Sequence, residues 1–260
     1  MSELVVVGGG KMGEALVGGL IAAGWSSAAA ITVVEPDDAR RAELAERFAG
    51  LVVSAVPVAA TGALVAVKPQ YVASVCRSLG DLGVTRVLSI AAGVRIAVME
   101  AELPSGVGVV RAMPNTPSLV GAGAAAIAGG TTAAEADLVL AEGILGAVGT
   151  VVRVTEDQLD AVTGLSGSGP AYVFLVAEAL IDAGVRQGLP RPVATELTVQ
   201  TLRGAAELLA TGQSAAELRA AVTSPGGTTA AGLHVLETAA LRAAFADAVA
   251  AAADRSRQLG

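Results

Sequence analysis

A glycine-rich loop near the start of the chain has the residue types and spacing that bind a dinucleotide. The segment Gly8-Gly9-Gly10-Lys11-Met12-Gly13 matches G-x-G-x-x-G and follows the apolar run Leu4–Val7. In this pattern the first glycine permits a tight turn, the second admits the pyrophosphate to the backbone, and the third lets helix and strand pack closely. The flanking strands, the second of which ends at Glu35, favour a nicotinamide dinucleotide site over a turn without a ligand.

Glu35 bears on which nicotinamide dinucleotide is bound. It stands where an acidic residue hydrogen-bonds the hydroxyls of the adenosine ribose, which favours NADH. Arg40 and Arg41 follow closely and are able to accommodate the extra phosphate of NADPH. An exposed charge that opens a loop is an equally good interpretation of Glu35. The sequence therefore predicts NADPH or NADH and leaves the choice open.

A second glycine turn, Ser224–Thr229, enters a predicted helix late in the chain. Free backbone N–H groups at such a helix start bind anions, including a substrate carboxylate. The commoner use of this motif is an ordinary helix cap by serine or threonine. Both interpretations stand at this point.

The elements that position these loops alternate through the first part of the chain. Short β-branched runs predict strands, and their near-continuous apolar character suits a parallel sheet covered on both faces. These strands are Leu4–Val7, Ile31–Val34, Leu64–Val67, Arg86–Ser89, Val107–Arg111, Ala124–Ile127 and Val151–Val154. Helices are expected over Lys11–Ala23, Asp38–Ala49 and Ala133–Leu145. The pattern predicts a doubly wound α/β domain over residues 1–155.

The remainder, residues 156–260, has no confident strand and predicts an all-helical domain. Helices are expected over Pro170–Gln187, Pro192–Ala210, Thr228–Leu236 and Ala239–Gln258. Ser214 and Glu217 form a capping box for a short helix between them.

Composition argues against several other classes of protein. Hydrophobic residues make up 53% and charged residues 16%, which is typical of a globular protein with a large core. An aromatic content of 2% and a net charge of −7 argue against nucleic-acid binding. The uncharged stretch Phe48–Val67 is interrupted by Pro57 and Gly62, so we interpret it as two buried strands and expect no membrane span. A single cysteine, Cys76, and the absence of a leader pattern predict a cytoplasmic protein. We expect no metal site.

Further motifs decide the family. Ala66-Val67-Lys68-Pro69, Ser89-Ile90-Ala91-Ala92-Gly93-Val94 and Arg111-Ala112-Met113-Pro114-Asn115-Thr116-Pro117 each follow a predicted strand, where ligands bind in open α/β sheets. They are joined by Glu156–Tyr172, which contains Gly-Leu-Ser-Gly-Ser-Gly-Pro-Ala-Tyr, and by Ser224-Pro225-Gly226-Gly227-Thr228-Thr229. Together these segments resemble the pyrroline-5-carboxylate reductase family, from Leu4 through the final helix.

The resemblance implies reduction of the cyclic imine 1-pyrroline-5-carboxylate to L-proline by hydride from NADPH or NADH, the last step of proline biosynthesis. It implies a Rossmann-type doubly wound parallel sheet followed by an all-α C-terminal dimerisation domain. In the family this domain interleaves with its twin in a homodimer, and dimers assemble into a decamer.

The resemblance also implies roles for particular residues. It places the substrate carboxylate on the Ser224–Thr229 loop, including Gly226, with main-chain groups of Gly227 and Thr228. It places the Thr229 hydroxyl near the ring nitrogen, as hydrogen-bond partner and proton donor. Glu156 and Thr163 face the cleft, where Glu156 either attracts the iminium or caps the helix that follows.

On the cofactor side the resemblance adds residues beyond the glycine loop, Glu35 and Arg40. Val67, Lys68 and Pro69 lie near the cofactor, and Ala91, Ala92 and Gly93 lie against the nicotinamide ribose. Asn115, the only asparagine, either orients the nicotinamide or stabilises its loop. His234, the only histidine, is expected to be a core or interface residue.

Three other functions fit parts of this pattern. A β-hydroxyacid dehydrogenase is disfavoured because it needs a lysine in the helical domain, and this chain has no lysine after Lys68. A reductase of another small cyclic imine stays open, since a ring-size change costs only about 1–3 kcal/mol of discrimination. A non-catalytic dinucleotide-binding protein also stays open, although it has no use for a second anion site.

Overall fold

The structure is a computed structural model that describes residues 2–259, apart from the side chain of Ser2. The chain divides into two compact units. Unit 1 contains the chain up to Ser168 together with the segment from Ala250 onward, and unit 2 contains Gly169–Val249. The last turns of the final helix therefore belong to unit 1.

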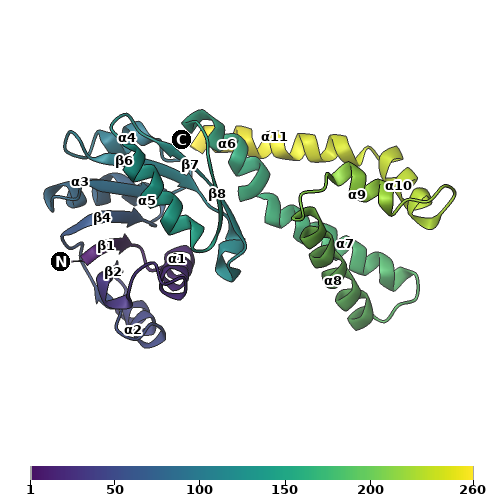
Figure 1. Cartoon of the computed structure of the whole chain (residues 1–260), viewed down its shortest axis with the longest axis horizontal. Helices are drawn as coiled ribbons and strands as arrows, with labels where there is room; N and C mark the ends of the chain where they lie inside the picture. Colours follow the sequence, from purple (N-terminus) through teal and green to yellow (C-terminus); the bar gives the residue numbers. More distant parts are fainter. Residues whose placement is uncertain (1, 260) are drawn as a thin grey trace. The chain divides into compact units, whose positions relative to one another are not determined.

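Unit 1 is built on an eight-stranded sheet with the order β3-β2-β1-β4-β5-β6-β7-β8 (Figure 1). The strands are β1 (Ser2–Val7), β2 (Ile31–Val34), β3 (Val52–Ser54), β4 (Ala60–Val65), β5 (Arg86–Ser89), β6 (Gly108–Met113), β7 (Gly123–Gly129) and β8 (Gly149–Arg153). The order reverses direction between β1 and β4, which is the switch point where ligands bind in such sheets. The predicted doubly wound sheet is confirmed.

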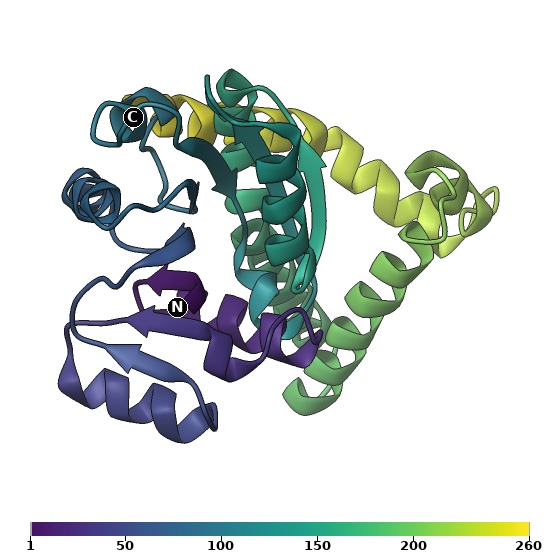
Figure 2. The ribbon, with the colours of Figure 1, turned by 60° about the vertical axis from the view of Figure 1, so that its left-hand side comes forward.

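Helices cover both faces of the sheet (Figure 2), and alternate side chains of each strand point to opposite faces. On one face Val5 and Val7 join a core with Val72 and Met99, and on the other Leu4 joins a core with other helices. The first core takes side chains from α3 (Val72–Asp81), α4 (Ile96–Glu100) and α6 (Leu159–Val162). The second takes them from α1 (Lys11–Ala22), α2 (Asp38–Arg47) and α5 (Glu135–Gly146).

The sheet is parallel from β3 to β6 and reverses at β7, so it is mixed. β6 and β7 pair antiparallel, with Arg111 opposite Ala128, and β8 then runs parallel to β7. Only a short connection, containing the 3₁₀ turn η3 (Thr116–Val120), joins β6 to β7. A parallel crossover needs a dozen or more residues and usually a helix, so this connection returns the chain in the opposite direction.

The stretch Phe48–Val67 contains two strands as predicted, but only one of them is buried. β4 lies in the middle of the sheet, whereas β3 is a three-residue edge strand with an exposed Val52. The prediction of two buried strands was wrong for β3, because an edge position leaves that strand without a neighbour on its outer side.

Unit 2 is all-helical. It contains α7 (Gly169–Arg186), α8 (Arg191–Leu209), α9 (Ala215–Ala221), α10 (Thr228–Thr238) and the first part of α11 (Leu241–Leu259). The predicted capping box of α9 is present, since the Ser214 and Glu217 side chains each bond the other's backbone N–H. α7 and α8 pack as neighbours, and the Tyr172 hydroxyl of α7 donates to the Ala248 carbonyl of α11 (3.5 Å).

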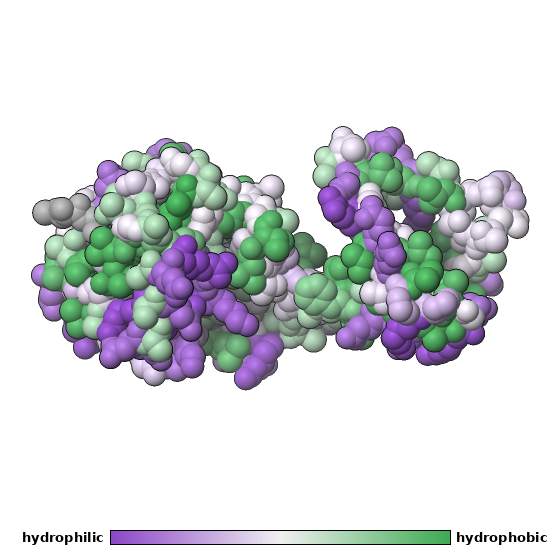
Figure 3. Space-filling view, turned by 90° about the horizontal axis from the view of Figure 1, so that it is seen from below, coloured by the Kyte–Doolittle hydropathy of each residue, from purple (hydrophilic) through white to green (hydrophobic). Residues whose placement is uncertain are grey.

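Unit 2 has almost no core of its own. Among residues 169–249, all of which the structure describes, only Ala194 and Thr198 are buried. Large apolar side chains such as Phe174 (63% exposed) and Leu175 (66% exposed) lie at its surface. Figure 3 shows hydrophobic surface of this kind among the hydrophilic side chains of the helices. A unit of this size needs further burial to be stable, so this surface requires a partner.

One helical stretch, Glu156–Arg186, is long and apolar enough to cross a membrane by length and composition. It begins with the acids Glu156 and Asp157 and includes the π-helical turn η5 (Thr163–Gly167). Exposed apolar side chains on α7 equally suit a helix covered by another protein chain.

The end of α11 is fixed to unit 1 by a buried hydrogen bond. The Ser256 hydroxyl donates to the Asp160 carboxylate of α6 at 2.6 Å, and both residues are buried. Nearby, the Leu259 carbonyl lies so close to Gly93 that a Cβ there would stand 3.1 Å from its oxygen.

We expect Asp160→Ala to lower the free energy of unfolding by about 1–3 kcal/mol, because the buried Ser256 hydroxyl then has no acceptor. The measurement is urea unfolding at fixed protein concentration. The control is Asp157→Ala, whose carboxylate is 92% exposed and pairs with Arg95 at 3.3 Å, a surface pair with a contribution of about 0–1 kcal/mol. Equal effects of the two substitutions would contradict this account of α11.

Candidate active site

The glycine loop joins β1 to α1 at the carboxyl edge of the sheet. Gly8 has φ of +110°, and a Cβ on it would lie 2.5 Å from the carbonyl oxygen of Ala66, just after β4. Gly13 packs so tightly against the Gly8 carbonyl that no side chain fits. Gly10, in contrast, has nothing within 4 Å of an added Cβ. The first and third glycines therefore shape the loop, and the second leaves open space above it.

That open space is a cavity of about 460 Å³ at the switch point between β1 and β4. It is lined by the ends of three parallel strands and the start of α3. The residues are Val7, Gly8, Gly10, Val34, Glu35, Pro36, Ala55, Pro57, Ala66, Val67, Lys68, Tyr71, Ser74 and Val75. The predicted residues Gly8, Gly10, Glu35, Val67 and Lys68 are brought together here. The cavity and the open side of Gly10 fit the phosphates and adenosine of a dinucleotide.

Sequence reasoning missed Tyr71 and Ser74 in this cavity. Tyr71 ends the 3₁₀ turn η2 (Pro69–Tyr71), directly after the predicted Val67-Lys68-Pro69 segment. It is one of only two tyrosines in the chain. A rare aromatic residue next to a predicted cofactor-binding segment could have indicated that it lines the cavity.

Glu35 and Arg40 both bind the backbone of the glycine loop. The Glu35 carboxylate accepts hydrogen bonds from the N–H of Gly9 (3.0 Å) and of Asp37 (3.1 Å). The Arg40 Nε donates to the Gly9 carbonyl at 2.7 Å. Gly9 is thus held on both sides of its peptide, which fixes the loop before any ligand binds.

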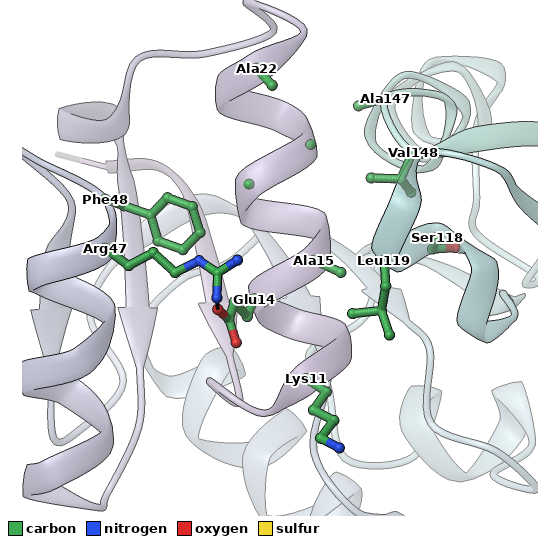
Figure 4. A pocket seen from close by; sticks show the side chains of 13 residues that line it. Lys11, Glu14, Ala15, Ala22, Arg47, Phe48, Ser118, Leu119, Ala147 and Val148 are labelled. Carbon is green, nitrogen blue, oxygen red and sulfur yellow. Dashed lines mark ion pairs between the residues drawn. The ribbon is translucent and has the colours of Figure 1, made fainter. Parts of the chain in front are cut away.

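The side chains of Lys11 and Met12 lie away from this cavity, although their backbone forms the start of α1 directly after Gly10. Lys11 begins α1 beside a second cavity of about 350 Å³ that runs along the outer side of the helix (Figure 4). In the same cavity Arg47 pairs with Glu14 at 2.6 Å. Met12 packs against the core on the α1 face of the sheet.

The loop after β5 carries Ala91, Ala92 and Gly93. The buried Ser89 hydroxyl accepts a hydrogen bond from Ala91 N–H (3.3 Å), and Gly93 has φ of +77°. Ala91 and Gly93 are buried while Ala92 is exposed. Gly93 is therefore required by its backbone conformation and by the nearby end of α11.

Asn115 stabilises the loop after β6. Its amide nitrogen donates to the Ser166 carbonyl (3.1 Å), and its amide oxygen accepts from Ala124 N–H (2.8 Å). Both ends of this buried amide are therefore bonded to the backbone. Of the two roles predicted for Asn115, this supports stabilisation of the loop over orientation of the nicotinamide. Ser166 lies in η5, where a Cβ on Gly167 would lie 2.5 Å from Met113 Cε, so this turn rests against the end of β6.

Glu156 forms an ion pair that sequence reasoning missed. Its carboxylate accepts from the buried Arg111 guanidinium at 3.0 Å and from Ile96 N–H at 2.7 Å, at the start of α4. Glu156 thus joins β6 and α4, and the helix it caps is α4 rather than the one that follows it. Further along the chain, Thr163 begins η5, and its hydroxyl donates to the Leu159 carbonyl (2.8 Å).

The Ser224–Thr229 turn lies in unit 2 and opens α10. The helix is capped by Gly227, and no side chain caps it, so the ordinary serine or threonine cap is absent at this described helix. Gly226 has φ of +69°, and Gly227 N–H donates to the Ser224 carbonyl (3.0 Å). The first-turn amides, beginning with Thr228, have no partner within the helix. His234 on the same helix is exposed.

Comparison with known proteins decides the family. A model of pyrroline-5-carboxylate reductase dimerisation matches residues 156–259, and one of NADP oxidoreductases, coenzyme F420-dependent, matches residues 3–93. The chain is 43% identical to a pyrroline-5-carboxylate reductase of Corynebacterium melassecola, over 100% of this chain and 99% of that protein. The enzyme of Synechocystis sp. is 45% identical, over 99% and 98%.

The chain belongs to the pyrroline-5-carboxylate reductase family. The predicted resemblance is confirmed. A solved pyrroline-5-carboxylate reductase of Coxiella burnetii has a TM-score of 0.94 and 40% identity over 100% of this chain and 98% of that one. The Plasmodium falciparum pyrroline carboxylate reductase, solved with NADP bound, has a TM-score of 0.85 and 30% identity over 100% and 98%.

Family membership makes the chain an NAD(P)H-dependent oxidoreductase, as predicted. The match to the dimerisation model also assigns a partner to the exposed apolar side chains of unit 2, and supports the predicted homodimer.

We expect Gly10→Ala to leave the fold intact and to weaken dinucleotide binding. Gly10 has an extended backbone, φ −66° and ψ −179°, and free space at the Cβ position, so alanine fits. The added methyl then occupies the space that a bound pyrophosphate needs, and the Kd for NADH should rise by about tenfold or more, a loss of about 1.4 kcal/mol.

The measurement is a fluorescence titration with NADH, with the melting temperature recorded for each variant. Gly146→Ala is the matched control, since this glycine also has open space and ends α5 away from the cavity. An unchanged Kd in Gly10→Ala would show that the dinucleotide does not approach the loop at this residue.

Proposed function

We propose that this chain reduces 1-pyrroline-5-carboxylate to L-proline, with the dinucleotide in the cavity of unit 1 and the substrate carboxylate at the start of α10. The placement of the substrate carboxylate rests on one observation: the start of α10 at Gly227 has no side-chain cap. A small anion is the natural ligand of such a helix start, and the substrate of this reaction carries one carboxylate.

For the cofactor we propose three groups of contacts. The backbone of Gly8, Gly9 and Gly10, with the α1 start formed by Lys11, Met12 and Gly13, receives the pyrophosphate. Glu35 contacts the adenosine ribose, and Arg40 holds the glycine loop beside it through the Gly9 carbonyl. Val67 and Lys68 line the cavity, and Pro69 follows them in η2. The nicotinamide ribose lies against the small-residue loop Ala91-Ala92-Gly93, of which Ala92 is exposed.

For the substrate we propose that the amides of Thr228 and Thr229 bind the carboxylate. This differs from the role expected for Gly227, whose N–H is used inside the turn by Ser224. Gly226 supplies the positive φ that the turn requires, and a Cβ on Gly227 would collide with the Ser224 hydroxyl.

The chemistry makes modest demands on the protein. NAD(P)H supplies a hydride to the carbon of the protonated imine, and the ring nitrogen keeps its proton as the secondary amine. Thr229, half-buried in the first turn of α10, is the residue we propose to hydrogen-bond that nitrogen. Its hydroxyl passes the proton to the imine nitrogen before hydride transfer and takes up a replacement proton from solvent. The rest of the site orients the substrate and excludes water.

We propose that Glu156 and Asn115 act on the site by positioning. Glu156 holds β6 to the segment that leads to Thr163, and Asn115 holds the β6 loop to η5. The carboxylate of Glu156 is committed to Arg111 and Ile96, which disfavours its direct attraction of the iminium.

Thr229→Ala should lower kcat by about 10²-fold, the usual contribution of a positioned acid–base group, with the Kd for NADH unchanged. The measurement is steady-state NADH and NADPH oxidation with 1-pyrroline-5-carboxylate, together with a binding titration. Thr238→Ala is the control on the same helix, because that hydroxyl only bonds the His234 carbonyl (2.8 Å). Collapse of cofactor binding in Thr229→Ala would remove this residue from the substrate site.

We further propose that the homodimers assemble into a decamer. The support is the extent of exposed apolar side chains in unit 2, which includes Leu180, Leu197 and Leu236 on three different helices. Sedimentation equilibrium distinguishes the two assemblies, and a single species of two chains across the concentration range would contradict the decamer.

We also propose that the protein works in the cytoplasm. Its one cysteine, Cys76, is a buried thiol in α3, and burial raises the pKa of that thiol to about 11, so it stays protonated and unreactive. Fractionation of the source cells tests this location.

A further inference from the structure

The charge at the end of β2 decides between the two cofactors. NADPH differs from NADH by one phosphate dianion on the adenosine ribose, and in sheets of this kind the residue at the end of β2 meets that ribose. The solved Plasmodium falciparum relative has NADP bound, so family membership alone does not make the choice. The answer lies in the partners of Glu35, Arg40 and Arg41.

We propose that this chain selects NADH, that Glu35 is the specificity-determining residue, and that Arg40 and Arg41 do not bind a ribose phosphate. The proposal rests on the cofactor site proposed above. It replaces the open choice left by the sequence, in which the two arginines balanced the one carboxylate.

Glu35 presents a fixed carboxylate to the cavity. Two backbone N–H groups, those of Gly9 and Asp37, each bond one of its two oxygens, and Glu35 itself lines the cavity. Each oxygen keeps acceptor capacity for a ribose hydroxyl, whereas a phosphate in the same place meets a like charge.

Each of the three nitrogens of Arg40 already has an acceptor within the protein. Its Nε donates to the Gly9 carbonyl (2.7 Å), one terminal nitrogen bonds Glu43 (2.9 Å), and the other bonds Glu14. The hydrogen bond that Arg40 donates to the Glu14 carboxylate is the main reason why the pKa of Arg40 is raised above its usual value. Freeing this side chain breaks a contact that holds the glycine loop, so phosphate binding here opposes dinucleotide binding.

Arg41 is engaged in a similar way. One terminal nitrogen donates to the main-chain oxygen of Glu35 (2.6 Å), and the other pairs with Asp38. This arginine therefore fixes the backbone of Glu35, and it carries its own counter-charge. Carboxylates also outnumber guanidinium groups around these two arginines. The carboxylates are those of Glu14, Glu35, Asp37, Asp38 and Glu43, and the guanidinium groups are those of Arg40, Arg41 and Arg47.

Lys68 is the cation that lines the cavity itself. It follows β4, which is separated from β2 by β1, so the strand ends lie about 9–10 Å apart at the usual spacing. This distance places Lys68 on the pyrophosphate side of the cavity and away from the ribose edge that Glu35 occupies.

The test measures binding without substrate. NADH and NADPH are titrated separately into the full-length protein and followed by nucleotide fluorescence, so the readout does not depend on imine reduction. We expect the Kd of NADPH to exceed that of NADH by about tenfold or more, and the ratio to fall as salt is raised from 0.05 to 0.5 M, since salt screens like-charge repulsion.

Two substitutions identify the residue responsible. Glu35→Ser should shift the ratio of the two Kd values toward NADPH by about tenfold or more, and Glu35→Gln, which keeps the size of the side chain, should shift it in the same direction. Glu46→Gln on the exposed side of α2 removes the same charge and should leave the ratio unchanged. Arg40→Gln should weaken both cofactors alike.

Each outcome bears on a definite claim. Equal or tighter binding of NADPH by the unaltered protein overturns the inference, whatever the variants do. An unchanged ratio in both Glu35 variants, or selective loss of NADPH binding in Arg40→Gln, also overturns it. Binding of neither dinucleotide overturns the proposed cofactor site as well, which separates failure of the site from failure of the preference.

Discussion

The close passage of the glycine loop beside β4 is the constraint on which the rest of unit 1 depends. No side chain fits between Gly8 and the carbonyl of Ala66, so the loop turns directly from β1 into α1 at the switch point of the sheet. Gly9 is then reached from β2 by Glu35 and from α2 by Arg40. The contacts that hold the loop in shape are the same ones that occupy the arginine otherwise suited to a phosphate. The same contacts of Arg40 therefore hold the glycine loop in shape and underlie the proposed preference for NADH.

The helical half depends on a partner for a different reason. Unit 2 buries only Ala194 and Thr198 among its residues, so its helices cannot be stable through their own packing. A second copy of the chain supplies the missing burial, in agreement with the dimerisation match. The Ser224–Thr229 turn belongs to this unit. Stability of the turn that we propose to bind the substrate thus depends on assembly of the dimer.

The sequence predicted most elements of the fold, because β-branched runs and helix caps act locally; the strands Ile31–Val34 and Arg86–Ser89 were placed to the residue. The reversal at β7 was not predicted, since it depends on the length of a connection rather than on the strand's composition. Of the residues around the cavity, the glycine loop and Glu35 were predicted from spacing and Lys68 from the family resemblance, but the pairing of Glu156 with Arg111 was not predicted. Such pairs join residues far apart in the chain, and their geometry exists only once the sheet has formed.

The central claim is that this chain transfers hydride from a bound nicotinamide to the carbon of a small carboxylated imine. Transfer of label tests it most directly: the protein is supplied with 1-pyrroline-5-carboxylate and NADH deuterated at C4 on the transferring face, and the product is analysed by mass spectrometry. The account predicts L-proline that carries one deuterium on the former imine carbon. Unlabelled proline, or deuterated dinucleotide that remains unconsumed, would contradict it.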